Sequence, residues 1–195
     1  MKHSSSRELF GHWNERRGAR ALPERGDIEP AAVRKSLGDT FILGSESAAD
    51  LRFRLAGTRM CALFGRELKD EAFAALWDAA HQSLVCRLLA IVGEEEIGVV
   101  AGARGRTPEG FSADLELLLL PLRHRGRPGR RMLGVLAPVT VPLWLGASRL
   151  EPLSLGSLRH LGPAVLAPAA PSRLSAVIAR DQPRHGFVVY DGGRS

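Results

Sequence analysis

Short stretches in which apolar residues alternate with polar ones, or follow one another without a break, predict five β-strands in this chain. They are residues 40–43, 51–56, 97–106, 111–122 and 132–141. In the second stretch Leu51, Phe53 and Leu55 alternate with two arginines, which is typical of a strand with one buried face. The last three stretches follow one another with only short connections, which favours antiparallel pairing.

Apolar residues at a spacing of three or four predict helices at two places. Residues 71–92 contain no glycine or proline and predict the longest helix, with Trp77, Leu84 and Leu88 on its apolar side. Residues 7–17 predict an amphipathic helix whose apolar side is formed by Leu9, Phe10 and Trp13. These three side chains need an apolar surface to pack on, and we expect them to mediate dimerisation.

The predicted strand at residues 111–122 is apolar on both faces toward its end. Leu115, Leu117 and Leu119 share one face, and the opposite face becomes apolar from Leu118 onward. A terminal helix packed on this outer face would explain the pattern. Glu116, which lies on the outer face, has two interpretations: a cross-strand ion pair with an arginine, or part of a polar patch at a pocket or a helix-docking surface.

The chain has 195 residues, of which 45% are hydrophobic, enough for one domain with extensions. We expect a helical extension at residues 1–37, the main domain at 38–146, and a C-terminal extension at 147–195. The last of these is rich in proline and alanine, a composition that forms little regular structure, so we expect it to be partly disordered or docked.

The net charge of +6 raises the question of an anionic partner. The basic residues are mostly arginines spread along the chain, with one dense group between two predicted strands. This group consists of Arg123, Arg125, Arg127, Arg130 and Arg131. An exposed hairpin loop accounts for it, and a surface for an anion or a protein partner is the alternative; we do not expect nucleic-acid binding.

Neither a secretory leader nor a membrane-spanning stretch is predicted, and we expect a cytoplasmic protein without membrane contact. Two cysteines, Cys61 and Cys86, fit a reducing compartment, and we expect both to be buried among apolar residues. The six histidines are scattered, and no spacing typical of a metal site or a catalytic nucleophile is present. We therefore predict no metal site, no catalytic residues and no enzymatic activity.

Four groups of residues resemble an alphaproteobacterial family of small proteins with a single PAS domain. They are Trp13 followed by Arg20, Pro23, Arg25, Asp27 and Pro30; residues 53–58 with 65–68; residues 116–122; and residues 133–134. The resemblance covers roughly residues 7–145. It implies an α+β fold, namely a PAS-like five-stranded antiparallel sheet with helices packed on one face, preceded by the N-terminal helical extension.

The resemblance also implies a sensor or regulatory role in signalling, without specifying a cofactor, and none is required by the sequence. We expect a homodimer that acts by contacting a protein partner. The space between the sheet and the long helix is expected to receive a small ligand. Its candidate lining residues are Phe53, Leu55, Trp77, His81, Leu84 and Leu117. The alternative function is a regulator that binds nucleic acid or an anionic nucleotide through the loop from Arg123 to Arg131.

Overall fold

A six-stranded antiparallel sheet forms the centre of the computed structural model, which describes residues 1–45, 50–125 and 127–161. The strands are β1 (Thr40–Gly44), β2 (Arg52–Ala56), β3 (Gly98–Arg106), β4 (Ser112–His124), β5 (Arg127–Pro138) and β6 (Ser154–Leu161). Their order across the sheet is β2-β1-β5-β4-β3-β6, and every neighbouring pair is antiparallel. The predicted α+β class with an antiparallel sheet is confirmed.

The sheet has one strand more than predicted. Strand β6 pairs with β3 and extends the sheet beyond the three consecutive strands β3, β4 and β5. The expectation of little regular structure after residue 147 is therefore wrong for Ser154–Leu161. The remainder of the C-terminal extension, residues 162–195, lies outside the described residues.

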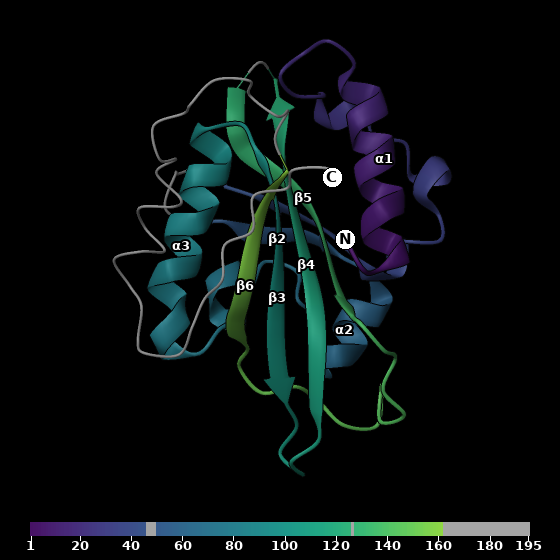
Figure 1. The fold of residues 1–195 in the computed structure, drawn as a ribbon, viewed down its shortest axis with the longest axis vertical. Helices are drawn as coiled ribbons and strands as arrows, with labels where there is room; N and C mark the ends of the chain where they lie inside the picture. Colours follow the sequence, from purple (N-terminus) through teal and green to yellow (C-terminus); the bar gives the residue numbers. More distant parts are fainter. Residues whose placement is uncertain (46–49, 126, 162–195) are drawn as a thin grey trace, which may run out of the picture.

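Three α-helices and four short 3-10 helices accompany the sheet in the described ranges (Figure 1). The α-helices are α1 (Ser4–Arg17), α2 (Thr58–Phe64) and α3 (Ala79–Glu94). The 3-10 helices are η1 (Arg25–Asp27), η2 (Pro30–Val33), η3 (Leu37–Asp39) and η4 (Phe73–Leu76). Together they cover both sides of the sheet.

The long helix starts later than its apolar pattern predicts. Residues 73–76 form the separate helix η4, and Trp77 is extended, with φ −109° and ψ 147°. Helix α3 begins after Asp78, whose side chain accepts a hydrogen bond from the backbone N–H of His81. Such a cap satisfies an otherwise free donor of the first turn, so Asp78 fixes the start of the helix.

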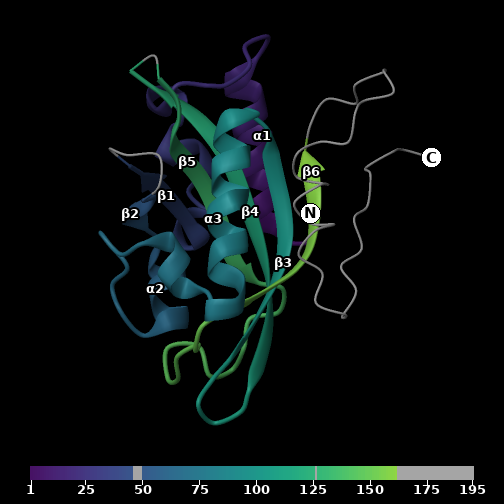
Figure 2. The ribbon, with the colours of Figure 1, turned by 90° about the vertical axis from the view of Figure 1, so that its left-hand side faces the viewer.

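One face of the sheet packs against α2, η4 and α3. Figure 2 shows α3 in front of the sheet and α1 behind it. The larger of two buried apolar clusters lies between the sheet and α3, with Leu117 and Leu119 from β4 and Val85 and Leu88 from α3. We call this side the inner face.

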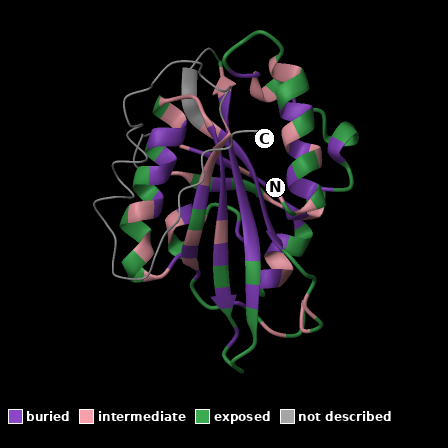
Figure 3. Cartoon of the chain, viewed as in Figure 1, coloured by how far each residue is buried: buried purple, intermediate pink, exposed green. Residues whose placement is uncertain are grey.

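The opposite, outer face is covered by α1. Leu9 and Trp13 of α1 pack with Leu118, Leu120 and Val135 of the sheet in the second buried cluster. The expectation of helices on one face thus holds for α2 and α3, whereas the N-terminal extension lies on the other. Buried residues run along much of the central strands, and exposed residues lie on the surfaces of α1 and α3 (Figure 3). The outer-face helix suggested by the apolar pattern of β4 is confirmed.

Candidate functional site

Five of the six residues predicted to line a ligand pocket lie beneath or along α3. Phe53, Trp77 and Leu117 are buried in the inner cluster. Leu84 and His81 on α3 are half-buried, and Leu84 packs against the same cluster. The structure therefore brings most of the predicted set to one region.

Leu55, the sixth residue, is 44% exposed, so its predicted place in the interior is wrong. Ile42 pairs with Leu55, but the next residue, Leu43, pairs with Phe53, which leaves Arg54 as an extra residue on β2. An extra residue of this kind is a β-bulge and interrupts the alternation of faces. The bulge places Leu55 beside Ile42 on the outer side, away from Phe53.

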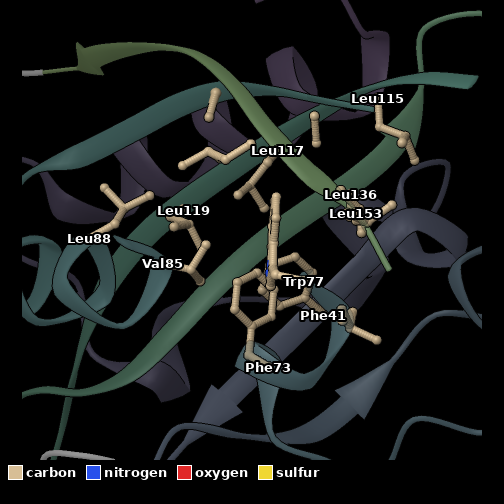
Figure 4. Close-up of a cluster of buried hydrophobic side chains, with 14 of the residues drawn as sticks. Phe41, Phe73, Trp77, Val85, Leu88, Leu115, Leu117, Leu119, Leu136 and Leu153 are labelled. Carbon is tan, nitrogen blue, oxygen red and sulfur yellow. The ribbon is translucent and has the colours of Figure 1, made fainter. Parts of the chain in front are cut away.

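Aromatic rings fill the part of the interior between β1, β2 and η4. The ring of Phe73 lies 5.4 Å from that of Phe41, 5.6 Å from that of Phe53 and 5.9 Å from that of Trp77, measured between centroids. Such tilted pairs are favourable arrangements of aromatic rings. Figure 4 shows the Trp77 ring between Leu117 of the sheet and Phe73.

The indole N–H of Trp77 is the unusual polar group of this interior. Trp77 is 1% exposed, and its Nε1 has no acceptor among the residues that the structure describes. A buried donor without an acceptor costs about 1–3 kcal/mol, and buried indoles ordinarily find a partner. The surrounding cluster consists of apolar side chains, which offer this N–H no oxygen or nitrogen acceptor.

His81 has a structural task at the start of α3. Its Nδ1 lies 2.7 Å from Oδ1 of Asp78, the residue that caps the helix. The cysteines differ from each other: Cys61 is half-buried, and burial raises the pKa of its thiol, whereas Cys86 is exposed. The expectation that both are buried is wrong for Cys86, which lies on the outward side of α3.

The arginine-rich group lies at the β4–β5 hairpin, but the expectation of a loop from Arg123 to Arg131 is wrong: β4 extends to His124 and β5 begins at Arg127. The described arginines also differ in their surroundings. Arg125 is exposed, whereas Arg123 is half-buried and its backbone N–H donates to the carbonyl of Pro23. The guanidinium of Arg131 lies directly over Gly44. The side chains of Arg127 and Arg130 lie outside the described part. The described arginines therefore do not share one environment.

The apolar side of α1 is already buried within the single chain. Leu9 is fully buried, Trp13 is 4% exposed, and Phe10 is half-buried beside them. The indole Nε1 of Trp13 donates to the carbonyl of Pro121 at 2.9 Å. The reason for expecting dimerisation through these side chains no longer holds, because their apolar surface packs on the outer face of their own sheet.

Glu116 fixes the start of α1 to the sheet. Its carboxylate, 5% exposed, accepts hydrogen bonds from the backbone N–H groups of Lys2 and His3, the latter at 3.0 Å. Burial of the carboxylate works against its ionisation. The hydrogen bonds outweigh this effect, and the pKa of Glu116 lies below its ordinary value of 4.5. Of the two interpretations of Glu116, the helix-docking surface is the one observed; Asp114 forms the cross-strand ion pair, with Arg104.

Replacing Glu116 by glutamine is expected to reduce the free energy of unfolding at pH 7 by about 1.5–3 kcal/mol, because hydrogen bonds to a charged acceptor are lost. The folded-state pKa is depressed, so the stabilisation is present above pH 4.5 and is lost as the pH falls through the lower folded value. Urea unfolding at pH 7 and at pH 3 measures the loss of unfolding free energy and its dependence on pH. Glu15→Gln on the exposed side of α1 is the control, expected within about 0.5 kcal/mol. Equal losses of unfolding free energy at pH 7 and pH 3 would contradict the role of the ionised Glu116 carboxylate as the acceptor of these hydrogen bonds.

A second carboxylate joins α1 to the inner-face helices. Asp39, 2% exposed, accepts a hydrogen bond from Oγ of Ser5 at 2.6 Å. The guanidinium of Arg59 donates to both of its oxygens, at 2.8 and 2.7 Å. Asp39 closes η3, Ser5 belongs to α1 and Arg59 to α2. One buried carboxylate therefore links helices from opposite faces of the sheet.

A groove runs along the outer face between α1 and β6. Its lower part encloses about 630 Å³ and includes Lys2, Glu116, Ser157 and Arg159 in its lining. Its upper part encloses about 380 Å³ and is lined in part by Phe10, Trp13, Arg17, Glu96, Arg159 and Leu161. Arg159 lines both parts, and we call the two together the α1–β6 groove.

The described residues contain no group of three or more histidine, cysteine, aspartate or glutamate side chains placed to hold a metal ion. Within the same ranges, no helix has both the length and the apolar character needed to cross a membrane.

Comparison with known families agrees with this architecture. The profile of the PAS domain family matches residues 1–137, a span that runs from the start of α1 nearly to the end of β5. The chain belongs to the PAS domain family. Membership indicates a sensor or regulatory role for this PAS protein. No curated protein matches the chain.

Three of the features that organise the outer face were not expected from the sequence: the Asp39 linkage, the backbone bonds to Glu116 and the groove. Asp39 follows a glycine and precedes the predicted strand at residues 40–43, a position typical of an ordinary turn residue. Its partners Ser5 and Arg59 lie 34 and 20 positions away. For Glu116, the sequence signal was a polar residue within an otherwise apolar region of β4. This signal left two interpretations open.

Proposed function

We propose that this PAS protein is a non-enzymatic, cytoplasmic regulator that binds a small molecule in its interior and acts by contacting a protein partner. The observation that carries the ligand part is the unpaired Nε1–H of Trp77, deep in a cluster of apolar side chains. The PAS family assignment supports the regulatory part.

The chemistry of the interior defines the class of ligand. Phe41, Phe73 and Leu117 offer apolar contacts on the sides of Trp77, and the indole offers one donor. A molecule that is mostly hydrocarbon and carries one neutral acceptor, such as a carbonyl or ether oxygen, satisfies both. An anion does not, because nothing in the described cluster carries a positive charge. Half-buried Leu84 on α3 packs against this cluster.

Native mass spectrometry of the freshly purified protein tests this proposal. We expect a bound mass in the wild-type protein and a loss of affinity of about fivefold to hundredfold for Trp77→Phe, which keeps an aromatic ring but removes the donor. Phe111→Leu, at an exposed position of the β3–β4 hairpin, is the matched control and is expected to retain the ligand. A wild-type protein without a bound molecule, both as purified and after incubation with a library of neutral apolar compounds, would refute the proposal.

A further inference from the structure

The floor of the lower part of the α1–β6 groove is open at one glycine. On the outer face of β3, Val100 and Gly102 line the lower part of the groove, and Gly102 carries no side chain. The space beside Gly98 is filled by Leu120 and Leu161. A Cβ added at Gly102 would make only an ordinary contact, 3.4 Å from Oγ of Ser157. The backbone does not require glycine at this position. The missing side chain instead leaves an open channel between α1 and β6.

The dimensions of the channel suit an extended peptide. Residues 100–104 of β3, which line the lower part, span about 13 Å at roughly 3.3 Å per residue. An extended segment of about five residues has the same length. Helix α1 forms one wall of the upper part, with Phe10 and Trp13, and Lys2, just before the helix, lines the lower part. Strand β6 forms the other wall, with Ser157 and Arg159.

The charges that remain available in the groove are mainly positive. The carboxylates of Asp114 and Glu116 are engaged, the first by Arg104 at 2.7 Å and the second by backbone N–H groups. Lys2 and Arg159 have no carboxylate within 4.0 Å among the described residues.

At the upper end of the groove, Arg17 stacks on Trp13 and donates to Asn14, opposite Glu96. Arg159 also acts on the α-amine of Met1. Burial and the positive charge of Arg159 lower the pKa of this amine.

We propose that the α1–β6 groove binds an acidic, extended segment of a protein partner, with acidic side chains at Lys2 and Arg159 and apolar side chains over the floor at Val100 and Gly102. This inference rests on the proposed function, because it names the surface through which the regulator contacts its partner. Charge complementarity supplies specificity and speeds association.

Two occupants from the same chain fit the charges less well. Residues 162–195 contain four arginines and two aspartates, so they are basic. A second copy would present α1, which has three arginines and two glutamates, or another surface of a chain with a net charge of +6. An acidic segment from a different protein is the occupant that the charges favour.

Binding of two labelled hexapeptides to the full chain, followed by fluorescence polarisation, tests the proposal. One peptide alternates glutamate with leucine, and the other has lysine in place of each glutamate. We expect saturable binding of the acidic peptide alone, weakened as salt is raised. The double variant K2E/R159E is expected to lose at least about tenfold in affinity, whereas K69E, an exposed lysine outside the groove, changes it less than twofold.

Gly102→Val separates binding from folding. Its side chain would project into the channel, while valine suits a strand, so we expect unchanged or higher stability together with loss of peptide binding. Equal binding by Gly102→Val and the wild-type protein, or equal binding of the basic peptide, would overturn the proposal.

Two further outcomes would assign the groove to another occupant and also overturn the proposal. One is amide protection within residues 162–195 that Gly102→Val abolishes, and the other is a dimer in light scattering that the same variant dissociates. The ligand measured by native mass spectrometry is expected to remain in Gly102→Val. Loss of interior ligand and loss of the groove contact can therefore be told apart.

Discussion

Gly134→Val is expected to reduce the free energy of unfolding by about 3 kcal/mol or more, enough to unfold much of a marginally stable domain. Gly134 lies in β5, paired with Phe41 of β1 on one side and Leu119 of β4 on the other. A Cβ at this position would overlap the ring of Phe41 and the carbonyl oxygen of Leu118. The Phe41 side chain is fully buried and the Leu118 carbonyl belongs to the backbone, so neither can move without a large cost in free energy.

Urea unfolding followed by circular dichroism measures the effect. Gly102→Ala on β3 is the matched control, because the same Cβ there meets ordinary van der Waals distances. We expect it to change stability by no more than about 1 kcal/mol, in the stabilising direction. The double variant F41L/G134A should recover part of the loss of G134A, since the two positions share one contact. A Gly134→Val protein as stable as the wild type would show that β5 shifts to accept the side chain.

The sheet could be predicted from local patterns where those patterns were strong. Alternation in residues 51–56 and the continuous apolar run of β4 both indicated strands, and the apolar outer face of β4 indicated a covering helix. Strand β6 has glycine, serine and arginine among its leucines. It joins the sheet because β3 offers a free edge, a fact that residues 154–161 do not reveal by themselves.

The candidate site was harder to predict, because it depends on contacts between distant segments. Local periodicity brought Trp77 and Leu117 correctly to the inner face but placed Leu55 with them, since a bulge at Arg54 cannot be predicted from alternation. The amphipathic pattern of residues 7–17 likewise indicated an apolar partner for Trp13. It could not distinguish a second molecule from the sheet of the same chain, whose outer face proved to be that partner.

Asp39→Asn is expected to reduce the free energy of unfolding by about 2–3 kcal/mol, a loss that an exposed ion pair would not produce. Asparagine keeps the size of Asp39 but removes the charge to which Arg59 donates two hydrogen bonds and Ser5 one. The carboxylate is almost completely buried, whereas the Arg59 side chain is 46% exposed. The guanidinium can therefore regain water, which keeps the expected loss below that of a fully buried pair.

Asp114→Asn provides the matched control for this prediction. Asp114 also accepts a hydrogen bond from an arginine, Arg104, at 2.7 Å, but the two side chains are 63% and 64% exposed. Asp114→Asn is expected to reduce the free energy of unfolding by no more than about 1 kcal/mol.

Urea unfolding compares Asp39→Asn with Asp114→Asn, and amide exchange in α1 shows where Asp39→Asn acts. Faster exchange is expected in α1 before global unfolding, because the Ser5 contact is one of the bonds that hold this helix on the sheet. Equal losses in the two variants, or unchanged exchange in α1, would mean that the other contacts of α1 keep it in place, namely the packing of Leu9 and Trp13 and the hydrogen bonds to Glu116. In that case Asp39 would not couple the outer-face helix, which forms one wall of the groove, to α2 on the inner face.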